Sequence, residues 1–306
     1  SYGITGFLEV GRTQLNEDQY LTLCKACDRV LLMPDATVER LAIPWLHVVR
    51  AHPVFTNNYF DLFQSSSAKI YFRNWLRKLR NIAGWLKQLI RATQSDGKLW
   101  SGDQDLPGQV DVLFISHLLS VAQVGRSDDF YFSSLASDLA ARGYSVVIAL
   151  INHTDHPGVR LAGGWKGTNV PRVILSGSLN VSAEIKLYRR VRKESVRLKN
   201  LSRQEVDGLG RRVLSRAADE VLSGGSRRTL RMFLQISGLA AKVAPKTVAV
   251  TYEGHAWERI AFAATRSISP AIRCIGYQHS ALFRLQHAIR RKLSDAYNPD
   301  QILTSG

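Results

Sequence analysis

Two apolar, β-branched runs separated by a helix-like segment constrain the fold of this chain most strongly. Residues 247–251 (TVAVT) end in the polar tip 252–255 (YEGH), and residues 272–276 (IRCIG) end in the polar tip 277–280 (YQHS). This order of strand, helix and strand is typical of a parallel α/β sheet. Because ligands bind such sheets outside the carboxyl ends of the strands, we expect the functional site where these two tips meet.

Further apolar runs extend the predicted sheet in both directions along the chain. A near-continuous run at 110–116 predicts a strand covered on both faces, and the tip that follows it carries His117. Residues 180–244 predict three helices, of which the first two are rich in Arg and Lys. We therefore expect a Rossmann-like parallel sheet over residues 110–300 with a helical insertion at 180–244. Its other strands are predicted at residues 145–151, 172–176, 247–251, 272–276 and from 301 onward.

The first 109 residues are less regular. Short apolar runs at 30–33 and 45–49, with a helix-like piece between them, are interpreted as the remnant of an α/β unit within residues 1–94. Residues 95–109, rich in Gly, Asp, Ser and Pro, predict a linker. The chain begins without methionine and ends just after a predicted strand, which we interpret as a piece of a longer protein whose next domain starts at 301–306.

Residues 68–92 have the periodicity of an amphipathic helix with a basic face. No acidic residue occurs between Asp61 and Asp96. One interpretation is a helix that lies on an anionic membrane surface, with its tryptophans near the headgroups. The alternative is a helix packed on its own domain with a solvated basic face. On the first interpretation, the membrane contacts are Arg73, Trp75, Arg77, Lys78, Arg80 and Trp85.

The composition limits which kinds of partner and which cellular compartment suit this chain. The 41 Lys and Arg residues exceed the 25 Asp and Glu residues, which gives a net charge of +16. Such an excess attracts nucleic acid, anionic membranes or phosphorylated substrates. The three cysteines fit a reducing cytoplasm better than a disulfide scaffold, and Cys24 and Cys27 lack the second pair that a zinc site needs. No signal peptide and no long apolar run occur; with the basic helix and the family resemblance given below, this predicts a cytoplasmic protein that is peripheral on the inner membrane.

Several common catalytic motifs are absent from the sequence. There is no Walker phosphate loop, no G-x-G-x-x-G after a strand, no G-x-S-x-G elbow and no H-E-x-x-H zinc helix. His153 and His156 flank Asp155, but three such residues in a loop are weak support for a metal. We predict no metal and no cofactor.

Glu253 is the strongest candidate for chemistry. It stands directly after a predicted strand, and a buried carboxylate without a partner is costly, so it must face a cleft or a partner. It could deprotonate an acceptor hydroxyl or bind sugar hydroxyls. The alternatives are a cap for the helix that starts near His255, or an ion pair with Arg259. His279, after the next strand, could contact a phosphate or the acceptor, or be a core histidine.

Four segments carry a resemblance to a known family. They are the strand 111–116 (DVLFIS), the signature 252–259 (YEGHAWER), the tip 276–280 (GYQHS) and the segment 298–306 (NPDQILTSG). Over residues 110–306 the chain resembles the bacterial surface carbohydrate biosynthesis proteins, which are glycosyltransferases of the GT-B type. Members of that family often carry Asn and then Gln or Gly after the first glutamate, where Gly254 and His255 stand here.

The resemblance implies transfer of a sugar from a nucleotide-activated donor to a surface glycan such as O-antigen or capsule. In GT-B enzymes the amino-terminal domain mainly holds the acceptor, which is often lipid-linked, and the carboxyl-terminal domain holds the nucleotide sugar. Basic side chains and helix N-termini usually replace a metal there. This chain would then hold most of the acceptor domain and be inactive alone. We assign Glu253 and His279 as catalytic. The predicted substrate contacts are His117, His255, Glu258, Arg259, Gln278 and Ser280.

Two other functions remain open. A basic nucleic-acid-binding protein would explain the charge, although no RNP, KH, helix-turn-helix or zinc-finger signature occurs. A sugar-nucleotide epimerase of the GT-B architecture would share the fold, so fold alone does not separate it from a transferase.

Overall fold

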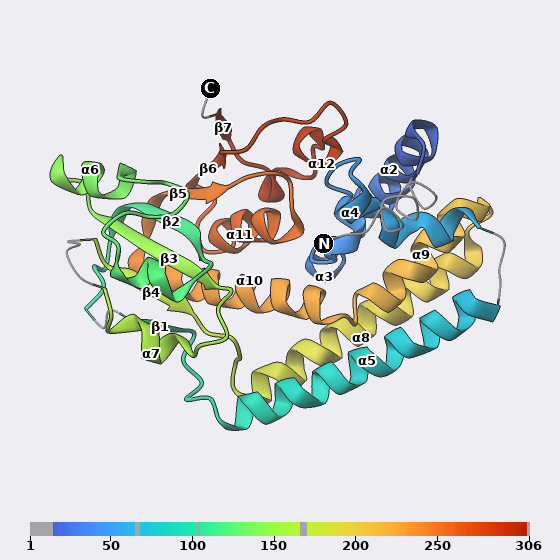
Figure 1. The fold of residues 1–306 in the computed structure, drawn as a ribbon, viewed down its shortest axis with the longest axis horizontal. Helices are drawn as coiled ribbons and strands as arrows, with labels where there is room; N and C mark the ends of the chain where they lie inside the picture. Colours follow the sequence, from blue (N-terminus) through green and yellow to red (C-terminus); the bar gives the residue numbers. More distant parts are fainter. Residues whose placement is uncertain (1–14, 65–67, 103–104, 166–169, 305–306) are drawn as a thin grey trace, which may run out of the picture.

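The computed structural model describes residues 15–64, 68–102, 105–165 and 170–304. A twisted sheet forms one end of the molecule and long helices form the other (Figure 1). The sheet has seven strands in the order β1-β4-β3-β2-β5-β6-β7. All neighbouring strands are parallel except β1 and β4. The strands are β1 Trp100–Gly102, β2 Val110–Leu118, β3 Val146–Asn152, β4 Arg172–Leu175, β5 Pro245–Thr251, β6 Arg273–Gln278 and β7 Gln301–Thr304.

The strand order of the parallel part is that of a Rossmann-like sheet. Numbered along the chain from β2, the six parallel strands read 3-2-1-4-5-6, the doubly wound order. The order reverses between β2 and β5, which pair directly, with Leu113 opposite Val248. The predicted α/β class with a mostly parallel, Rossmann-like sheet is therefore confirmed. The carboxyl ends of β2 and β5 flank the crevice where such sheets bind ligands.

Helices cover both faces of the sheet, which explains why its strands read as continuous apolar runs. On one face, α10 (Gly224–Val243) and α11 (Ala256–Arg266) pack Ile236, Leu239 and Phe262 against inward-facing side chains of β2 to β5. On the other face, α6 (Leu135–Ala141) and α7 (Gly158–Ala162) cover residues such as Ile148. Successive side chains of a strand point to opposite faces, so an unbroken apolar sequence suits a strand between two helical layers.

The predicted helical insertion is confirmed as three helices. They are α8 (Val181–Gln204), α9 (Gly208–Glu220) and α10. Each begins at a capping residue whose side chain accepts backbone N–H groups of the first turn: Asn180 for α8, Asp207 for α9 and Ser223 for α10. These caps define where the insertion turns.

The predicted α/β remnant in residues 1–94 is wrong over the part that the structure describes. Residues 15–64 form helices: α2 (Glu17–Leu31), α3 (Val38–Leu41), η1 (Pro44–His47), α4 (Pro53–Thr56) and η2 (Asn57–Phe63). The run that begins at Val30 is the end of an amphipathic stripe on α2 that includes Leu23 and Cys27. The second run, 45–49, directly follows Pro44, which begins a 3-10 helix that extends to His47. Short apolar runs fit a helix face and a strand equally well, and here the helical spacing decides.

The N-terminal helices and the insertion share one hydrophobic core. Leu23 and Cys27 of α2 and Leu46 of η1 pack with Val191 of α8 and Val213 of α9. The N-terminal segment and the insertion of the domain predicted at 110–300 therefore bury their apolar faces against each other. Figure 1 shows α2 and α9 side by side at the helical end, and these helices are in contact.

Two predicted boundaries also shift. The linker predicted at 95–109 contains β1, a short strand that pairs antiparallel with β4 at the sheet edge. The start of a second domain predicted at 301–306 falls on β7, which pairs in parallel with β6, so residues 301–304 belong to the same sheet. Residues 305 and 306 lie outside the described residues.

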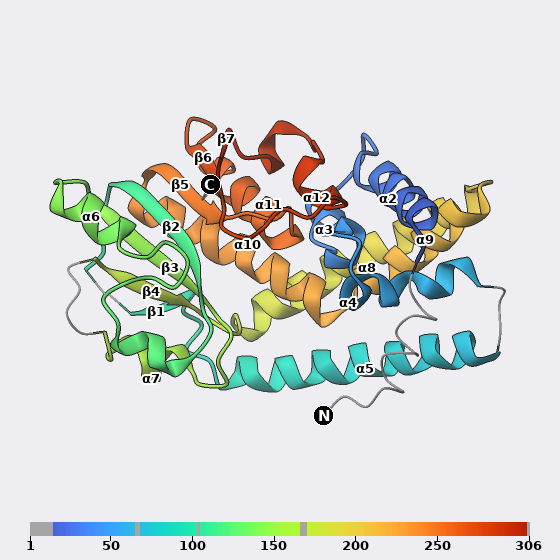
Figure 2. The same ribbon diagram turned by 45° about the horizontal axis from the view of Figure 1, so that its top comes forward.

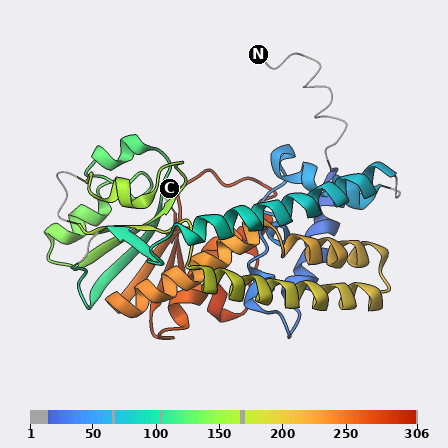
Figure 3. The same cartoon turned by 90° about the horizontal axis from the view of Figure 1, so that it is seen from below.

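Helix α5 (Ala68–Thr93) is the predicted basic helix. It runs along the outside of the molecule beside α8 (Figures 2 and 3), and it contacts α8 and α10. In the described part of the chain, no helix combines the length and the apolar character needed to cross a bilayer.

Candidate functional site

The tips of β5 and β6 meet, as the sequence predicts. Ser280, which follows β6, donates a hydrogen bond to Oε1 of Glu253, which follows β5. The side-chain amide of Gln278 in turn donates to the backbone oxygen of Ser280 at 2.9 Å and to its hydroxyl at 3.2 Å. Parallel strands end at the same edge of a sheet, which is why residues 27 positions apart lie in contact.

His255 completes a pair with Glu253. Its Nε2 lies 3.6 Å from Oε2 of Glu253. The neighbouring His255, against the opposing effect of burial, lowers the pKa of Glu253 to about 2, and the hydrogen bond from Ser280 acts in the same direction. Burial alone would lower the pKa of His255, but the carboxylates of Glu253 and Glu258 outweigh it and raise that pKa above its usual 6.5. The pair therefore holds an ionised carboxylate beside an imidazole that keeps its proton to a higher pH than a free imidazole does.

Glu258, predicted to contact substrate, instead holds the tip together. Its Oε2 accepts hydrogen bonds from the backbone N–H groups of Glu253 (2.9 Å), Gly254 (2.7 Å) and His255 (2.8 Å). Burial raises its pKa to about 7, although those bonds and the neighbouring His255 act against the rise. Because Glu258 fills this position, Glu253 does not cap α11, and its carboxylate remains available at the rim.

Gly254 lets the tip pass close to another segment. Its φ is +88°, and a Cβ placed on it would lie 2.4 Å from the carbonyl carbon of Ala288. Both the left-handed conformation and the close contact require glycine.

Arg259 is also structural, which corrects its predicted role in substrate binding. Its guanidinium is fully buried and does not pair with Glu253. It donates to Oδ1 of Asn298 (2.6 Å) and to the backbone oxygens of Ala288 and Arg291 (2.7 Å each). The segment 288–298 is thereby fixed to α11.

His117 lies in a cluster of rings at the carboxyl end of β2. Its Nδ1 is 2.8 Å from Nε2 of His153, which follows β3. Its ring contacts Trp257 of α11 at 4.8 Å and Tyr131 at 5.4 Å between centroids. Burial, and then the neighbouring His153, lower the pKa of His117 to about 3, so its imidazole is neutral and one of the two facing nitrogens donates to the other.

Tyr131 connects this cluster to the tips of β5 and β6. Its ring meets that of His279 at 4.6 Å between centroids. Burial, and then the charge of Glu253, raise its pKa. Nδ1 of His279 is buried without a hydrogen-bond partner in the described structure. Glu253, His255, Gln278, His279 and Ser280 thus share one rim with His117.

Sequence reasoning missed Tyr131, Trp257, Arg50 and the role of His153. Arg50 comes from the N-terminal helical segment, and its charge lowers the pKa of Glu253. Its guanidinium lies 5.0 Å from the ring of Phe55 and 4.7 Å from that of Phe283. The only sequence signal for Arg50 was its place after an apolar run that proved helical, so nothing linked it to the sheet.

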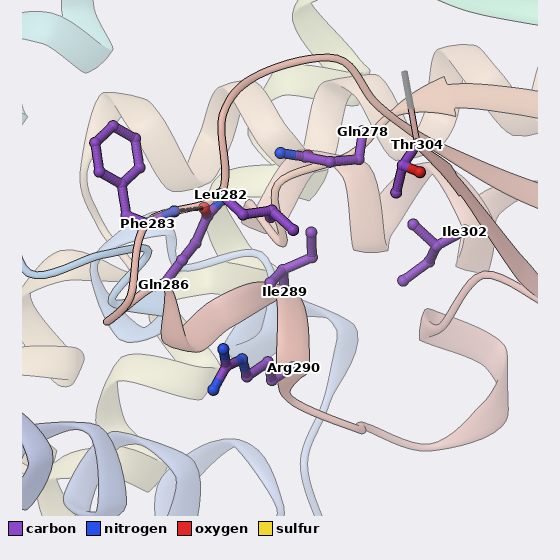
Figure 4. Close-up of a pocket in the computed structure, with 8 residues that line it drawn as sticks. All are labelled: Gln278, Leu282, Phe283, Gln286, Ile289, Arg290, Ile302 and Thr304. Atoms are coloured by element: carbon purple, nitrogen blue, oxygen red, sulfur yellow. Dashed lines mark hydrogen bonds between the residues drawn. The ribbon is translucent and has the colours of Figure 1, made fainter. Parts of the chain in front are cut away.

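A cavity of about 250 Å³ opens beside Gln278 (Figure 4). Its walls are mainly apolar, but two buried glutamines line it with unsatisfied groups: Oε1 of Gln278 and Nε2 of Gln286 have no partner. One acceptor and one donor therefore remain for a bound molecule. The other lining residues are Leu282, Phe283, Ile289, Arg290, Ile302 and Thr304.

Among the described residues, no three His, Cys, Asp or Glu side chains converge as metal ligands. Comparison with protein-family models, with curated proteins and with solved structures gives no match. The function is therefore argued from the fold and the geometry of the site.

Proposed function

We propose that the protein is a glycosyltransferase of the GT-B type that moves a sugar from a nucleotide-activated donor to a surface-polysaccharide acceptor. The observation that carries this proposal is the group at the end of β5, beside the point where the strand order reverses: Ser280 donates a hydrogen bond to Glu253, and His255 lies 3.6 Å from the same carboxylate. A carboxylate and an imidazole in one rim provide what is needed to remove a proton from an attacking hydroxyl. The resemblance of residues 252–259 and 276–280 to surface carbohydrate biosynthesis proteins supports the same assignment.

The acid–base role belongs to the Glu253–His255 pair. A carboxyl with a pKa of about 2 is a weak base at neutral pH, so Glu253 alone is a poor proton acceptor. Its negative charge raises the pKa of His255 above 6.5, toward the range where proton exchange is efficient. His255 then receives the proton of the acceptor hydroxyl, and Glu253 orients the ring and stabilises the imidazolium.

Cationic and polar groups around the pair suit a phosphorylated substrate. Arg50 lies close enough to lower the pKa of Glu253, and Arg290 lines the adjoining cavity. Cations at these positions would stabilise the charge that develops on a leaving phosphate. The cavity beside Gln278 is apolar with one free donor and one free acceptor, which fits a part of the substrate that binds without reacting.

The test is release of nucleotide from activated sugars by the full-length protein. UDP-, GDP-, dTDP- and CMP-activated sugars are supplied separately with lipid extract as acceptor, and free nucleotide is measured. One class of nucleotide sugar should be consumed only in the presence of extract. Glu253→Gln should lower the rate of nucleotide release by about 100-fold or more. Asp155→Asn, in the loop after β3, is the control. Consumption of no class, or an unchanged rate in Glu253→Gln, contradicts the proposal.

The same assay separates the alternatives. An epimerase would interconvert a nucleotide sugar without releasing nucleotide and without extract. A nucleic-acid-binding protein would consume none of the donors and would retain duplex DNA at physiological salt.

A further inference from the structure

Helix α5 turns its apolar side away from the protein. Phe72, Trp75, Ile82 and Ile90 are exposed to 59%, 54%, 52% and 61%. Such an arrangement is unusual, because a surface helix normally packs its apolar stripe against the core. Tyr71, Leu76, Leu79 and Leu86 are exposed as well. Seven of these residues recur at helical spacing, and we call them the α5 stripe: Phe72, Trp75, Leu76, Leu79, Ile82, Leu86 and Ile90.

The polar side of α5 attaches the helix to the rest of the molecule. The side-chain amide of Gln88 donates to Glu184 of α8 at 3.2 Å, and Arg227 of α10 donates to the backbone oxygen of Asn81 at 3.3 Å. Trp85 stacks on Tyr188 of α8 with 4.4 Å between ring centroids. These contacts fix which way the helix faces, so the exposure of the stripe is built into the fold.

The predicted membrane contacts divide accordingly. Trp75, Arg73, Lys78 and Arg80 are exposed. Trp85 and Arg77 are only partly exposed, and Arg77 Nε lies 3.8 Å from Oε1 of Glu220 on α9. Trp85 and Arg77 therefore face α8 and α9 and attach the helix to them.

A row of cations borders the stripe. Arg73, Arg80 and Lys87 follow at intervals of seven residues, about two helical turns, so they line up along the helix. Arg91 extends the row, and Arg80, Lys87 and Arg91 are exposed. Arg73 is ion-paired with Asp61, whereas α5 itself carries no acidic residue beside the other cations of the row.

We propose that α5 docks the protein on an anionic lipid bilayer, with the α5 stripe in the boundary between headgroups and acyl chains and the cation row on lipid phosphates. The charge of α5 favours an anionic bilayer over a second copy of the chain. A second copy of the chain would bring a second cation row with no acidic residue on α5 to meet it, whereas anionic headgroups complement the cations directly. Lys and Arg side chains reach outward from such a depth while their stems cover apolar surface. The proposal is independent of sugar transfer, because no residue of α5 belongs to the candidate site.

The experiment is co-sedimentation of the full-length protein with vesicles of phosphatidylcholine, alone or mixed with phosphatidylglycerol. Binding should require phosphatidylglycerol. The triple variant Arg80→Gln, Lys87→Gln, Arg91→Gln should lower the partition coefficient by up to about 100-fold, because each cation near an anionic surface contributes about fivefold. Leu79→Gln, Ile82→Gln, Leu86→Gln should also abolish sedimentation, although these changes leave the charge untouched.

A matched control removes the same charge from another helix. Lys186→Gln, Arg189→Gln, Lys193→Gln takes three exposed cations from α8 and should sediment like the unchanged protein. Circular dichroism and molar mass in solution are measured for each variant. The proposal is overturned if the unchanged protein does not sediment, if the α8 variant loses as much binding as the α5 cation variant, or if the apolar variant sediments normally. A dimer that only the apolar variant dissociates, without vesicle binding, assigns the stripe to self-association instead.

Discussion

Nε2 of His255 lies 3.6 Å from Oε2 of Glu253, and each residue shifts the pKa of the other in the direction that favours charge on both. The two groups stand on one tight tip after β5, so their separation is set by the local backbone. This relationship can be measured without knowing the substrate.

The pKa of His255 should lie above 6.5 in the folded protein. Glu253→Gln removes the neighbouring negative charge and should lower that pKa, since burial then acts with less opposition. An NMR titration of the histidine ring protons measures both values, and His255→Gln identifies the resonance. A pKa at or below 6.5 in the unchanged protein would contradict the pairing.

The same shifts set the direction of pH effects on stability. Because the folded pKa of His255 is raised, its contribution is complete below pH 6.5 and is lost as the pH rises through the folded value. Glu253 has a lowered pKa, so its contribution is present above pH 4.5 and is lost as the pH falls toward about 2.

If transfer needs neutral His255, activity should fall as the pH drops below the pKa of His255. Glu253→Gln lowers that pKa, so the fall in activity should occur at a lower pH in the variant.

Glu258→Ala should lower the free energy of unfolding far more than Glu258→Gln does. Glu258→Ala leaves three buried N–H groups without an acceptor, and each costs about 1–3 kcal/mol in the free energy of unfolding. All three bonds go to one carboxylate oxygen, so the amide oxygen of Gln can accept them. Urea unfolding of both variants tests this, and equal losses would contradict the described geometry.

The pH dependence of unfolding gives a second readout for Glu258. Its raised pKa means that stability declines as the pH rises from 4.5 to about 7, because the folded state keeps a proton that the unfolded state releases. Glu258→Gln has no such proton, so this decline should disappear in the variant.

Gly254→Ala should destabilise the protein by about 2 kcal/mol or more, because the new methyl group meets the Ala288 carbonyl at a positive φ. Gly163→Ala is the matched control: Gly163 has a φ of −80° and no atom within 4 Å of the added Cβ. Its free energy of unfolding should change by less than about 0.5 kcal/mol. Thermal unfolding of the two variants compares them, and a similar shift in both would count against the close approach.

Arg259→Lys should lower the free energy of unfolding by about 3 kcal/mol, since one ammonium group cannot replace the two guanidinium nitrogens that serve three buried acceptors. Arg29→Lys, at an exposed ion pair with Asp207, should change it by less than about 1 kcal/mol. Urea unfolding measures both. If Arg259→Lys is as mild as the control, Arg259 is not the structural clamp described above.

The sheet and the meeting of its tips could be predicted from sequence because strands covered on both faces leave an unmistakable apolar run. Val110–Leu118 and Val146–Asn152 are such strands. Strand β1 has only three residues, of which Ser101 and Gly102 carry no apolar signal, so its place at the sheet edge depends on β4. The run at Val30 was ambiguous between strand and helix until its partners were known.

Three features of the structure depend on tertiary contacts that no local sequence pattern encodes. Arg259 looks like a ligand-binding cation in sequence, and its burial follows from the return of segment 288–298. Arg50 approaches Glu253 because its neighbours Val49 and Ala51 form backbone hydrogen bonds with the segment 285–288. The helical periodicity of α5 could be predicted from the sequence. The rule that apolar faces turn inward predicts the wrong orientation for it, because polar contacts with α8 and α10 hold the helix with its apolar stripe outward.

The hydrophobic core shared by α2, η1, α8 and α9 also governs how synthesis and folding can proceed. The ribosome releases the N-terminal helices well over a hundred residues before their packing partners exist. Until α8 and α9 have emerged, Leu23, Cys27 and Leu46 can pack only against other N-terminal residues such as Tyr59 and Leu62. The helical end of the molecule therefore assembles late, around strands β2 to β4 that are already made, and the newborn chain needs protection from aggregation during that delay.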